Sequence, residues 1–225
     1  MTGRPPSGMR TLGGHDEPRT RIVLVRHGEP ASAVQGIVAG PVGDTGLTEL
    51  GRTQVRVLAE RLSSSGELAD ATALYASTLP RAIETAELLA AGLGGIAVVV
   101  RHDLREHDPG ELDGLSWTEA AARFALPDFD TQPDTPVGPG AESLSGFHTR
   151  ARAALSELSA AHRGETVVVA CHGGIVAAGV GMAFGIPVSA RVMLPTRYAS
   201  MTELELTERG WRLGRYNDRY PVTDG

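Results

Sequence analysis

Residues 22–28 read IVLVRHG, and this stretch decides which fold the chain can adopt. Its first four residues are aliphatic and largely β-branched, a composition that predicts a buried strand. Arg26 and His27 then stand at the carboxyl end of that strand, the edge at which open α/β sheets bind their ligands. A guanidinium beside an imidazole at such an edge suits an anion, and phosphate above other anions. The stretch alone leaves open a plain strand that ends in polar residues, because so short a pattern is weak by itself.

A second stretch, far along the chain, repeats the pattern. Residues 166–174 read TVVVACHGG, so another apolar run ends at a histidine, His172, and two glycines follow it. The next residues, 175–178, read IVAA and predict the start of a helix. Glycines at such a turn let backbone N–H groups approach an anion, and the helix N-terminus adds partial positive charge. Two strand-end histidines, one of them beside an arginine, indicate an anion site rather than packing.

The rest of the chain alternates between strand-like and helix-like stretches. Strands are expected at 21–26, 71–77, 96–100 and 166–171. Helices are expected at 48–63, at 80–91, from 116 onward and at 142–162. This alternation predicts an α/β fold, a three-layer α/β/α sandwich around a largely parallel central sheet. The alternating segments 201–206 and 211–216 predict an antiparallel hairpin at one edge of the sheet.

The composition limits the classes of function. The chain has 225 residues, 41% hydrophobic content and a net charge of -6 at pH 7. One domain is expected over 21–225, and residues 1–20, rich in Gly, Pro and Arg, are expected to form a disordered extension. The negative charge argues against nucleic acid or an anionic membrane as a partner. With neither a signal peptide nor an apolar run of about 20 residues, a cytoplasmic protein is expected.

Two further motifs place charged side chains near the predicted strand ends. Residues 75–86 read YASTLPRAIETA and put Arg81 at the start of a helix, just after a strand. A cation there opposes the preference of the helix dipole, which indicates an anionic partner nearby. Residues 104–114 read LREHDPGELDG and offer Glu106 in a loop, with Asp108 as a rival carboxylate. All 21 basic residues are arginine, so side chains that hold a phosphate here must be arginines or histidines.

In their order and spacing, these four motifs resemble the histidine phosphatase superfamily, whose fold is that of the phosphoglycerate mutases. The match is to the branch with His-Gly-Gly at the second histidine, and it covers about residues 21–217. The resemblance implies that His27 attacks phosphorus, while Glu106 protonates the leaving oxygen and later activates water. It implies no metal and no other cofactor. The groups expected to hold the phosphoryl group are Arg26, Arg81, a protonated His172 and a backbone amide near Gly173.

The sequence departs from the family's pattern at two positions that bear on substrate binding. Many members carry an asparagine where this chain has Ala33, and a glutamine where it has Ala39. Gln35, Ser32 and Thr45 are the candidates to replace these amides. Turnover and substrate, rather than the type of reaction, depend on this difference.

Three functions stay open from the sequence. The leading hypothesis is a metal-independent phosphomonoesterase that acts on a small phosphorylated metabolite. The alternative enzyme is a cofactor-dependent phosphoglycerate mutase, but Arg123 is the one fixed cation in the segment 112–146, where such mutases carry more. A non-catalytic phospho-ligand-binding protein is the third.

The stretch 127–140, rich in proline, glycine and acids, is expected to be a substrate-selecting lid or a solvated linker. Its acids favour a substrate with no negative charge beyond its phosphate, and a homodimer is one possible assembly.

Overall fold

The computed structural model describes residues 19–190 and 193–219, which build one six-stranded sheet in the order β3-β2-β4-β1-β5-β6. The strands are β1 (Thr20–Arg26), β2 (Ala71–Ser77), β3 (Val98–Arg101), β4 (Thr166–Cys171), β5 (Met201–Thr207) and β6 (Gly210–Asp218). Strands β1 to β4 pair in parallel, whereas β5 and β6 form an antiparallel hairpin at the edge beside β1. The predicted sheet and hairpin are therefore confirmed, and β3 begins two residues later than expected.

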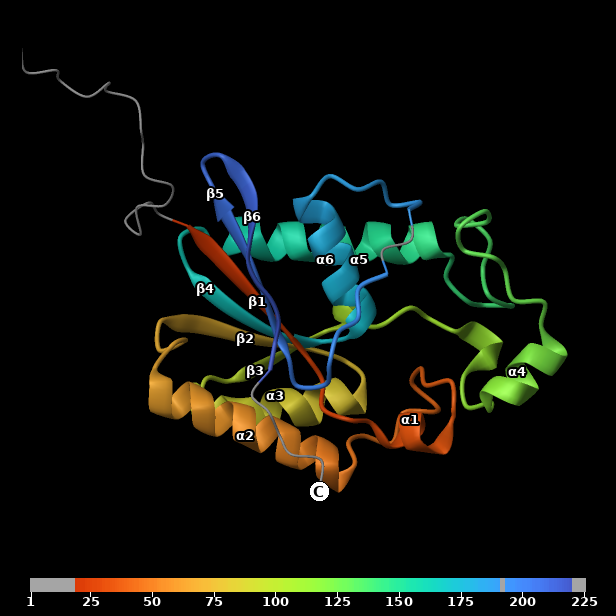
Figure 1. The fold of residues 1–225 in the computed structure, drawn as a ribbon, viewed down its shortest axis with the longest axis horizontal. Helices are drawn as coiled ribbons and strands as arrows, with labels where there is room; N and C mark the ends of the chain where they lie inside the picture. The colour runs from red at the N-terminus through yellow and green to blue at the C-terminus, as the bar shows by residue number, and fades with distance from the viewer. Residues whose placement is uncertain (1–18, 191–192, 220–225) are drawn as a thin grey trace, which may run out of the picture.

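Helices cover both faces of this sheet (Figure 1). They are α1 (Ala31–Gln35), α2 (Glu49–Ser65), α3 (Pro80–Gly92), α4 (Trp117–Arg123), α5 (Leu144–Ala161) and α6 (Gly173–Ala183). Helices α2 and α3 lie on one face and α5 and α6 on the other, which confirms the three-layer sandwich. Two single 3₁₀ turns, η1 (His102–Leu104) and η2 (Gly110–Leu112), lead from β3 toward α4. None of the helices in the described ranges is long and apolar enough to cross a lipid bilayer.

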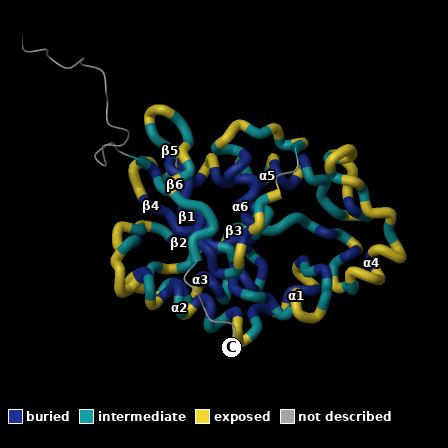
Figure 2. Tube along the Cα trace, viewed as in Figure 1, coloured by how far each residue is buried: buried dark blue, intermediate teal, exposed yellow. Residues whose placement is uncertain are grey.

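The position of β4 within the sheet explains why its sequence is apolar without interruption. All six of its residues are buried, because both faces of the sheet are covered. Val168 and Ala170 pack toward the layer of α2 and α3, whereas Val167, Val169 and Cys171 pack toward α5 and α6. Strand β4, most of β1 and most of α6 are accordingly buried, whereas the edge strands β3 and β6 are only partly buried (Figure 2). A sheet covered on both faces leaves its ends as the places for polar chemistry.

Two regions differ from the sequence-based expectations or add to them. The five-residue helix α1 was not expected, since a stretch this short shows no helical periodicity. The segment 127–140 is irregular, but Val137 is buried in a small apolar cluster with Leu112 and Ala120. This segment is therefore attached to the domain by an apolar contact. The expected disordered extension over 1–20 lies outside the described residues up to residue 18, and Thr20 already belongs to β1.

Candidate active site

The carboxyl ends of three neighbouring parallel strands bring the predicted site residues together. Arg26 ends β1 and His27 follows it, while His172 follows β4 and caps α6. Because β1 and β4 pair with Arg26 opposite Cys171, the rings of His27 and His172 lie 5.3 Å apart between centroids. Arg81 comes from the first turn of α3, just after β2. Residues far apart in the chain thus meet at one edge of the sheet, as the motifs predict.

The hydrogen bonds of His27 define its tautomer. Its Nδ1 lies 2.7 Å from the carbonyl oxygen of Gly28, which can only accept, so Nδ1 carries the proton. Its Nε2 therefore holds a lone pair, and it accepts a hydrogen bond of 3.2 Å from Nε of Arg81. Burial, and then the charge of Arg81, holds the pKa of His27 well below its ordinary value. The imidazole is neutral, with a nucleophilic nitrogen next to a guanidinium.

Arg81 is held in place by a buried carboxylate. Its Nη1 donates to Oδ2 of Asp44 at 2.9 Å and to the carbonyl of Ala39 at 3.1 Å. The side chains of Arg81 and Asp44 are 6% and 0% exposed, so water does not screen this ion pair. Asp44 itself accepts from the backbone N–H groups of Gly46 and Arg81. The carboxylate thereby fixes the direction in which Nε of Arg81 points, toward His27.

Arg26 keeps an unused donor in the same place. Its Nη1 donates to the carbonyl of Thr196, and its guanidinium lies 4.4 Å from the ring centroid of Tyr198. Its buried Nε has no hydrogen-bond partner within the described part of the chain. Burial lowers the pKa of Arg26, an effect that a bound anion would oppose. A buried N–H without a partner beside a nucleophile fits an oxygen of a phosphoryl group.

His172 corrects one expectation from the sequence. Complete burial, followed by the charges of Arg81 and its neighbours, holds the pKa of His172 well below the ordinary value, so the imidazole is neutral rather than protonated. Its Nε2 lies 2.8 Å from Oγ of Ser77, which already accepts from the N–H of Leu79. The Ser77 hydroxyl can then donate to Nε2, which leaves the proton on Nδ1. That Nδ1 is buried with no partner in the described ranges. His172 does not itself line the pocket but packs against the ring of His27, so its Nδ1–H is a neutral donor directly behind the nucleophile.

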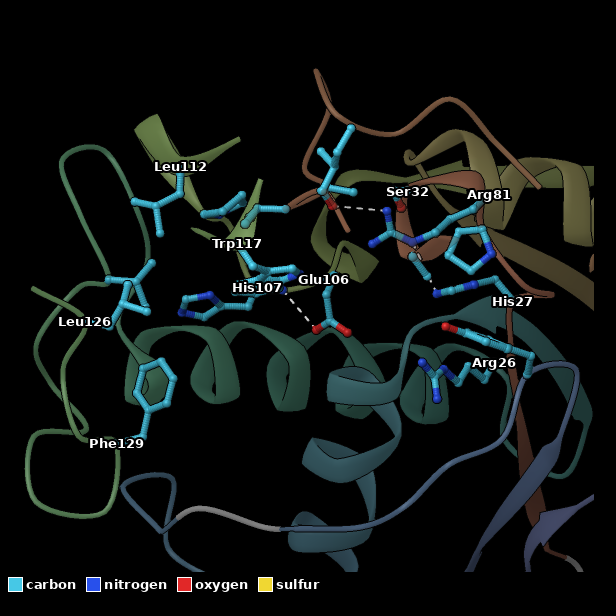
Figure 3. Close-up of a pocket in the computed structure, with 18 residues that line it drawn as sticks. Arg26, His27, Ser32, Arg81, Glu106, His107, Leu112, Trp117, Leu126 and Phe129 are labelled. Carbon is cyan, nitrogen blue, oxygen red and sulfur yellow. Dashed lines mark hydrogen bonds between the residues drawn. The ribbon is translucent and has the colours of Figure 1, made fainter. Parts of the chain in front are cut away.

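Glu106 comes from the loop after η1 and points into the pocket that His27 also lines (Figure 3). Its Oε2 accepts from the N–H of Gly174 at 2.9 Å, and its Oε1 accepts from its neighbour His107 at 3.0 Å. Gly174 is required here, since a Cβ at that position would overlap Oε1 of Glu106 and lie 2.8 Å from the ring of Phe147. The rival Asp108 pairs with Arg105 and does not line the pocket. The structure thus brings Glu106, rather than Asp108, to the site.

The loop that carries Glu106 is held by a second arginine. Arg150 on α5 donates to the carbonyl oxygens of Asp103 at 2.8 Å and Arg105 at 3.0 Å. It also pairs with both carboxylate oxygens of Glu142, at 2.7 and 2.6 Å. Arg150 therefore positions the loop without itself lining the pocket.

The predicted substrate-binding residues divide into two groups. Gly173 opens α6 next to Arg26: a Cβ added there would lie 3.7 Å from the guanidinium carbon. Gln35 and Thr45 are exposed, and neither lines the pocket. Ala33 and Ala39 do line it, together with the buried Ser32. The amide positions thus face the pocket as methyl groups, and of the three suggested replacements Ser32 alone reaches it.

The pocket has a volume of about 380 Å³ and two chemically different ends. Its polar end holds the side chains of Arg26, His27, Arg81 and Glu106. Figure 3 shows the other end surrounded by Leu112, Trp117, Leu126 and Phe129. Across the described residues, no three His, Cys, Asp or Glu side chains are grouped so that they could hold a metal ion.

Besides Arg150, sequence reasoning missed three contributors to the site. Asp44 orients Arg81, Ser77 holds His172, and Tyr198 packs on Arg26. Asp44 and Ser77 both lie inside motifs that the sequence had singled out, so their polarity was a usable signal. For Tyr198 no pattern in the sequence indicates a role.

The carboxyl edge of this open α/β sheet carries two neutral histidines, two arginines and a glutamate. This set of groups is typical of an enzyme that acts on phosphate esters. The chain belongs to the histidine phosphatase superfamily (branch 1), whose profile matches residues 22–219. This confirms the resemblance seen in the motifs, and it makes the protein a histidine phosphatase.

Individual relatives agree with this membership. In Arabidopsis thaliana, phosphoglycerate mutase-like protein 4 is 37% identical over 160 residues, which cover 69% of this chain and 67% of the relative. The metal-independent phosphoserine phosphatase of the same plant is 37% identical over 164 residues, covering 71% and 66%. The matched region is thus about two thirds of each plant protein. Among solved structures, mycobacterial glucosyl-3-phosphoglycerate phosphatase in complex with VO3 has a TM-score of 0.73 at 29% identity, covering 88% of this chain and 99% of that one.

Proposed function

We propose that this protein is a metal-independent phosphomonoesterase that hydrolyses a small phosphorylated metabolite through a phosphohistidine on His27. The observation that supports it most strongly is the state of His27. Its Nε2 holds a lone pair, in a buried ring, between two arginines and beside a neutral histidine donor. A neutral imidazole needs no base to become a nucleophile.

The first half of the reaction transfers the phosphoryl group to the protein. Nε2 of His27 forms a bond to phosphorus while the bond from phosphorus to the ester oxygen breaks. Arg26 and Arg81 stabilise the charge that spreads over the phosphoryl oxygens, and Nδ1–H of His172 donates to one of them. The leaving oxygen takes a proton from Glu106, which must be protonated when the ester binds.

The second half regenerates the protein. A water molecule attacks phosphorus, and the carboxylate of Glu106 takes one of its protons. The bond between phosphorus and Nε2 breaks, which releases inorganic phosphate and neutral His27. Both N–H groups that contact Glu106 belong to the backbone, so the carboxylate keeps its position between the two steps.

The mutase remains the alternative, because one relative carries a mutase-like name. A mutase must hold a substrate with further negative charge. Among the described residues that line the pocket, Arg26 and Arg81 are the only arginines, and both lie at the phosphoryl end. This distribution argues against the phosphoglycerates that a mutase interconverts, because it favours a substrate without further negative charge. The relatives named above act, by their names, on phosphoserine and glucosyl-3-phosphoglycerate, which supports a small phosphorylated substrate. A cytoplasmic location and the option of a homodimer stay predictions.

Phosphate release from a panel of phosphomonoesters, in excess EDTA, tests this proposal. His27→Ala should abolish release, and His102→Ala, which removes an exposed histidine, should retain it. Brief incubation of the wild type with a ³²P-labelled ester should give an acid-labile label that His27→Ala lacks. The panel includes 3-phosphoglycerate with 2,3-bisphosphoglycerate, and isomerisation without release would identify a mutase. Phosphate binding with neither activity would identify the non-catalytic alternative.

A further inference from the structure

The end of the pocket away from His27 is apolar. We call it the apolar end and define it by the side chains of Leu112, Trp117, Leu126, Phe129 and Val137. They come from η2, from α4, and from the segment that joins α4 to α5. In Figure 3 the labelled members lie across the pocket from Arg26, His27 and Arg81, with Glu106 between the two groups. An ester bound with its phosphorus at His27 must therefore extend its alcohol portion toward these side chains.

Two members of the apolar end are partly open to solvent. Trp117 is 58% exposed and Leu126 is 45% exposed, although both line the pocket. Large apolar side chains that stay exposed at the mouth of a cavity are typical of a ligand groove. Their exposed surface would be covered by an apolar ligand, which gives such a ligand a favourable contribution to binding.

No charged partner for a second anionic group reaches this end in the described part of the chain. The charged residues that line the pocket are Arg26, Arg81 and Glu106, and all three serve the phosphoryl end. His107 also lines the pocket, but burial lowers its pKa, so its ring is neutral near pH 7. A carboxylate or second phosphate at the apolar end would lose its hydration without gaining a cation.

The segment 127–140 contributes its apolar side chains to the pocket and turns its acids away. Phe129 and Val137 line the pocket, whereas Asp128, Asp130 and Asp134 are exposed and do not. Asp128 caps its own turn, since it accepts from the N–H of Asp130 at 3.0 Å. The sequence suggested that these acids select a substrate with no negative charge beyond its phosphate. The apolar side chains that line the pocket explain such a selection better than the acids do.

The volume of the pocket limits the size of the ligand that it can hold. An apolar cavity of about 150 Å³ holds one benzene ring. A pocket of about 380 Å³ can therefore hold a phosphoryl group, a short linker and one ring. Apart from the three charged residues and His27, the polar side chains of the lining are those of Ser32, His107, Trp117 and Tyr198, and Tyr198 packs on Arg26 at the phosphoryl end.

We infer that the substrate is the phosphate ester of an uncharged apolar alcohol about the size of a phenylethyl group, whose ring packs between Leu112, Leu126 and Phe129. This inference rests on the proposed phosphatase function and specifies its substrate class. It predicts that esters with a carboxylate or a second phosphate next to the ester group are not the preferred substrates.

The test compares alkyl phosphates with similar leaving groups. The probes are 2-phenylethyl phosphate, sn-glycerol 3-phosphate and 3-phosphoglycerate, with 4-nitrophenyl phosphate as a general phosphatase substrate. Burial of the ring should make kcat/KM for 2-phenylethyl phosphate roughly 10- to 150-fold higher than that for glycerol 3-phosphate. Activity on 4-nitrophenyl phosphate without this preference would overturn the inference and leave the proposed function intact.

A substitution at the apolar end gives a second arm. Leu126→Arg should lower kcat/KM for 2-phenylethyl phosphate about tenfold and raise it for 3-phosphoglycerate, because it supplies a cation where a carboxylate would lie. Leu126→Met, which conserves volume, should keep the wild-type preference. The side chain of Leu126 is partly exposed, so both variants should fold. An unchanged ratio of the two substrates in Leu126→Arg would place the alcohol elsewhere and overturn the inference.

A measurement of ligand binding tests this inference without requiring catalysis. By calorimetry in EDTA, the non-hydrolysable 3-phenylpropylphosphonate should bind at least tenfold more tightly than 3-phosphonopropionate. That order supports an uncharged apolar group as the ligand of the apolar end even if every ester fails as a substrate, in which case the proposed phosphatase function would be wrong. Equal affinities, or tighter binding of the carboxylate, would overturn the inference.

Discussion

The two buried histidines make the stability of the fold sensitive to acid. His27 is 4% exposed and His172 is fully buried, and burial, followed by the charge of Arg81, holds the pKa of each well below 6.5. Unfolding returns both rings to water, where they take up protons below about pH 6.5. The unfolded chain then binds more protons than the folded one. The free energy of unfolding therefore falls as the pH falls.

The size of the effect follows from proton linkage. Each histidine that stays neutral in the fold lowers the free energy of unfolding by about 1.4 kcal/mol between about pH 7.5 and 5.5. For the pair, the contribution is about 3 kcal/mol. In the double variant His27→Asn with His172→Gln, this part of the pH dependence should disappear, whatever the stability of that variant at neutral pH.

Urea unfolding at the two pH values measures this difference, in a buffer without phosphate or sulfate, because either anion could bind at the site. The exposed His102→Gln variant is the matched control and should keep the wild-type pH dependence. If the double variant loses as much stability on acidification as the wild type, the two histidines are not neutral in the folded protein. The account of His27 as a ready nucleophile would then be refuted.

Three further predictions concern the groups around the histidines. Glu106→Gln should lower kcat for alkyl phosphates about 10²- to 10⁴-fold but affect 4-nitrophenyl phosphate much less, since that ester needs little protonation of its leaving group. Equal losses on both esters would contradict the role as proton donor. Gly174→Ala should displace the Glu106 carboxylate and crowd Phe147, so kcat should fall as in Glu106→Gln, with about 1–3 kcal/mol lost in urea unfolding. Asp44→Asn should leave Arg81 buried without its counter-charge and lower stability by about 3–5 kcal/mol, and added phosphate should restore part of it. A stability loss that phosphate leaves unchanged would argue against Arg81 as a phosphate ligand.

Much of the fold was predictable because its signals are local. The apolar runs of β1 and β4 each occupy consecutive positions, and a sheet covered on both faces needs such runs. The capping box of α4, in which Ser116 and Glu119 exchange hydrogen bonds, is equally local, and it begins the helix where expected. Helix α1 was missed, because its five residues are too few to show a period.

The site was predictable in its residue types but not in its electrostatics. The motifs identified His27, Arg81, Glu106 and His172 as neighbours, since each follows or precedes a strand end. The neutral state of His172 was not foreseen, because it depends on how deeply the fold buries the ring and on the arginines that surround it. Gln35 and Thr45 could not be excluded beforehand, since the path of the chain after β1 depends on contacts with distant residues such as Asp113, which accepts from the N–H groups of Gly40 and Gly43.

By itself, the sequence determined the layered α/β fold, the family and the set of groups that can transfer a phosphoryl group, because periodicity and strand-end motifs are written in neighbouring residues. Only the tertiary structure decided which nitrogen of His27 carries the lone pair, that Asp44 holds Arg81, and that the far wall of the pocket is apolar. Each of these depends on burial and on distances between residues that are remote in the chain, and neither quantity can be obtained until the chain is folded.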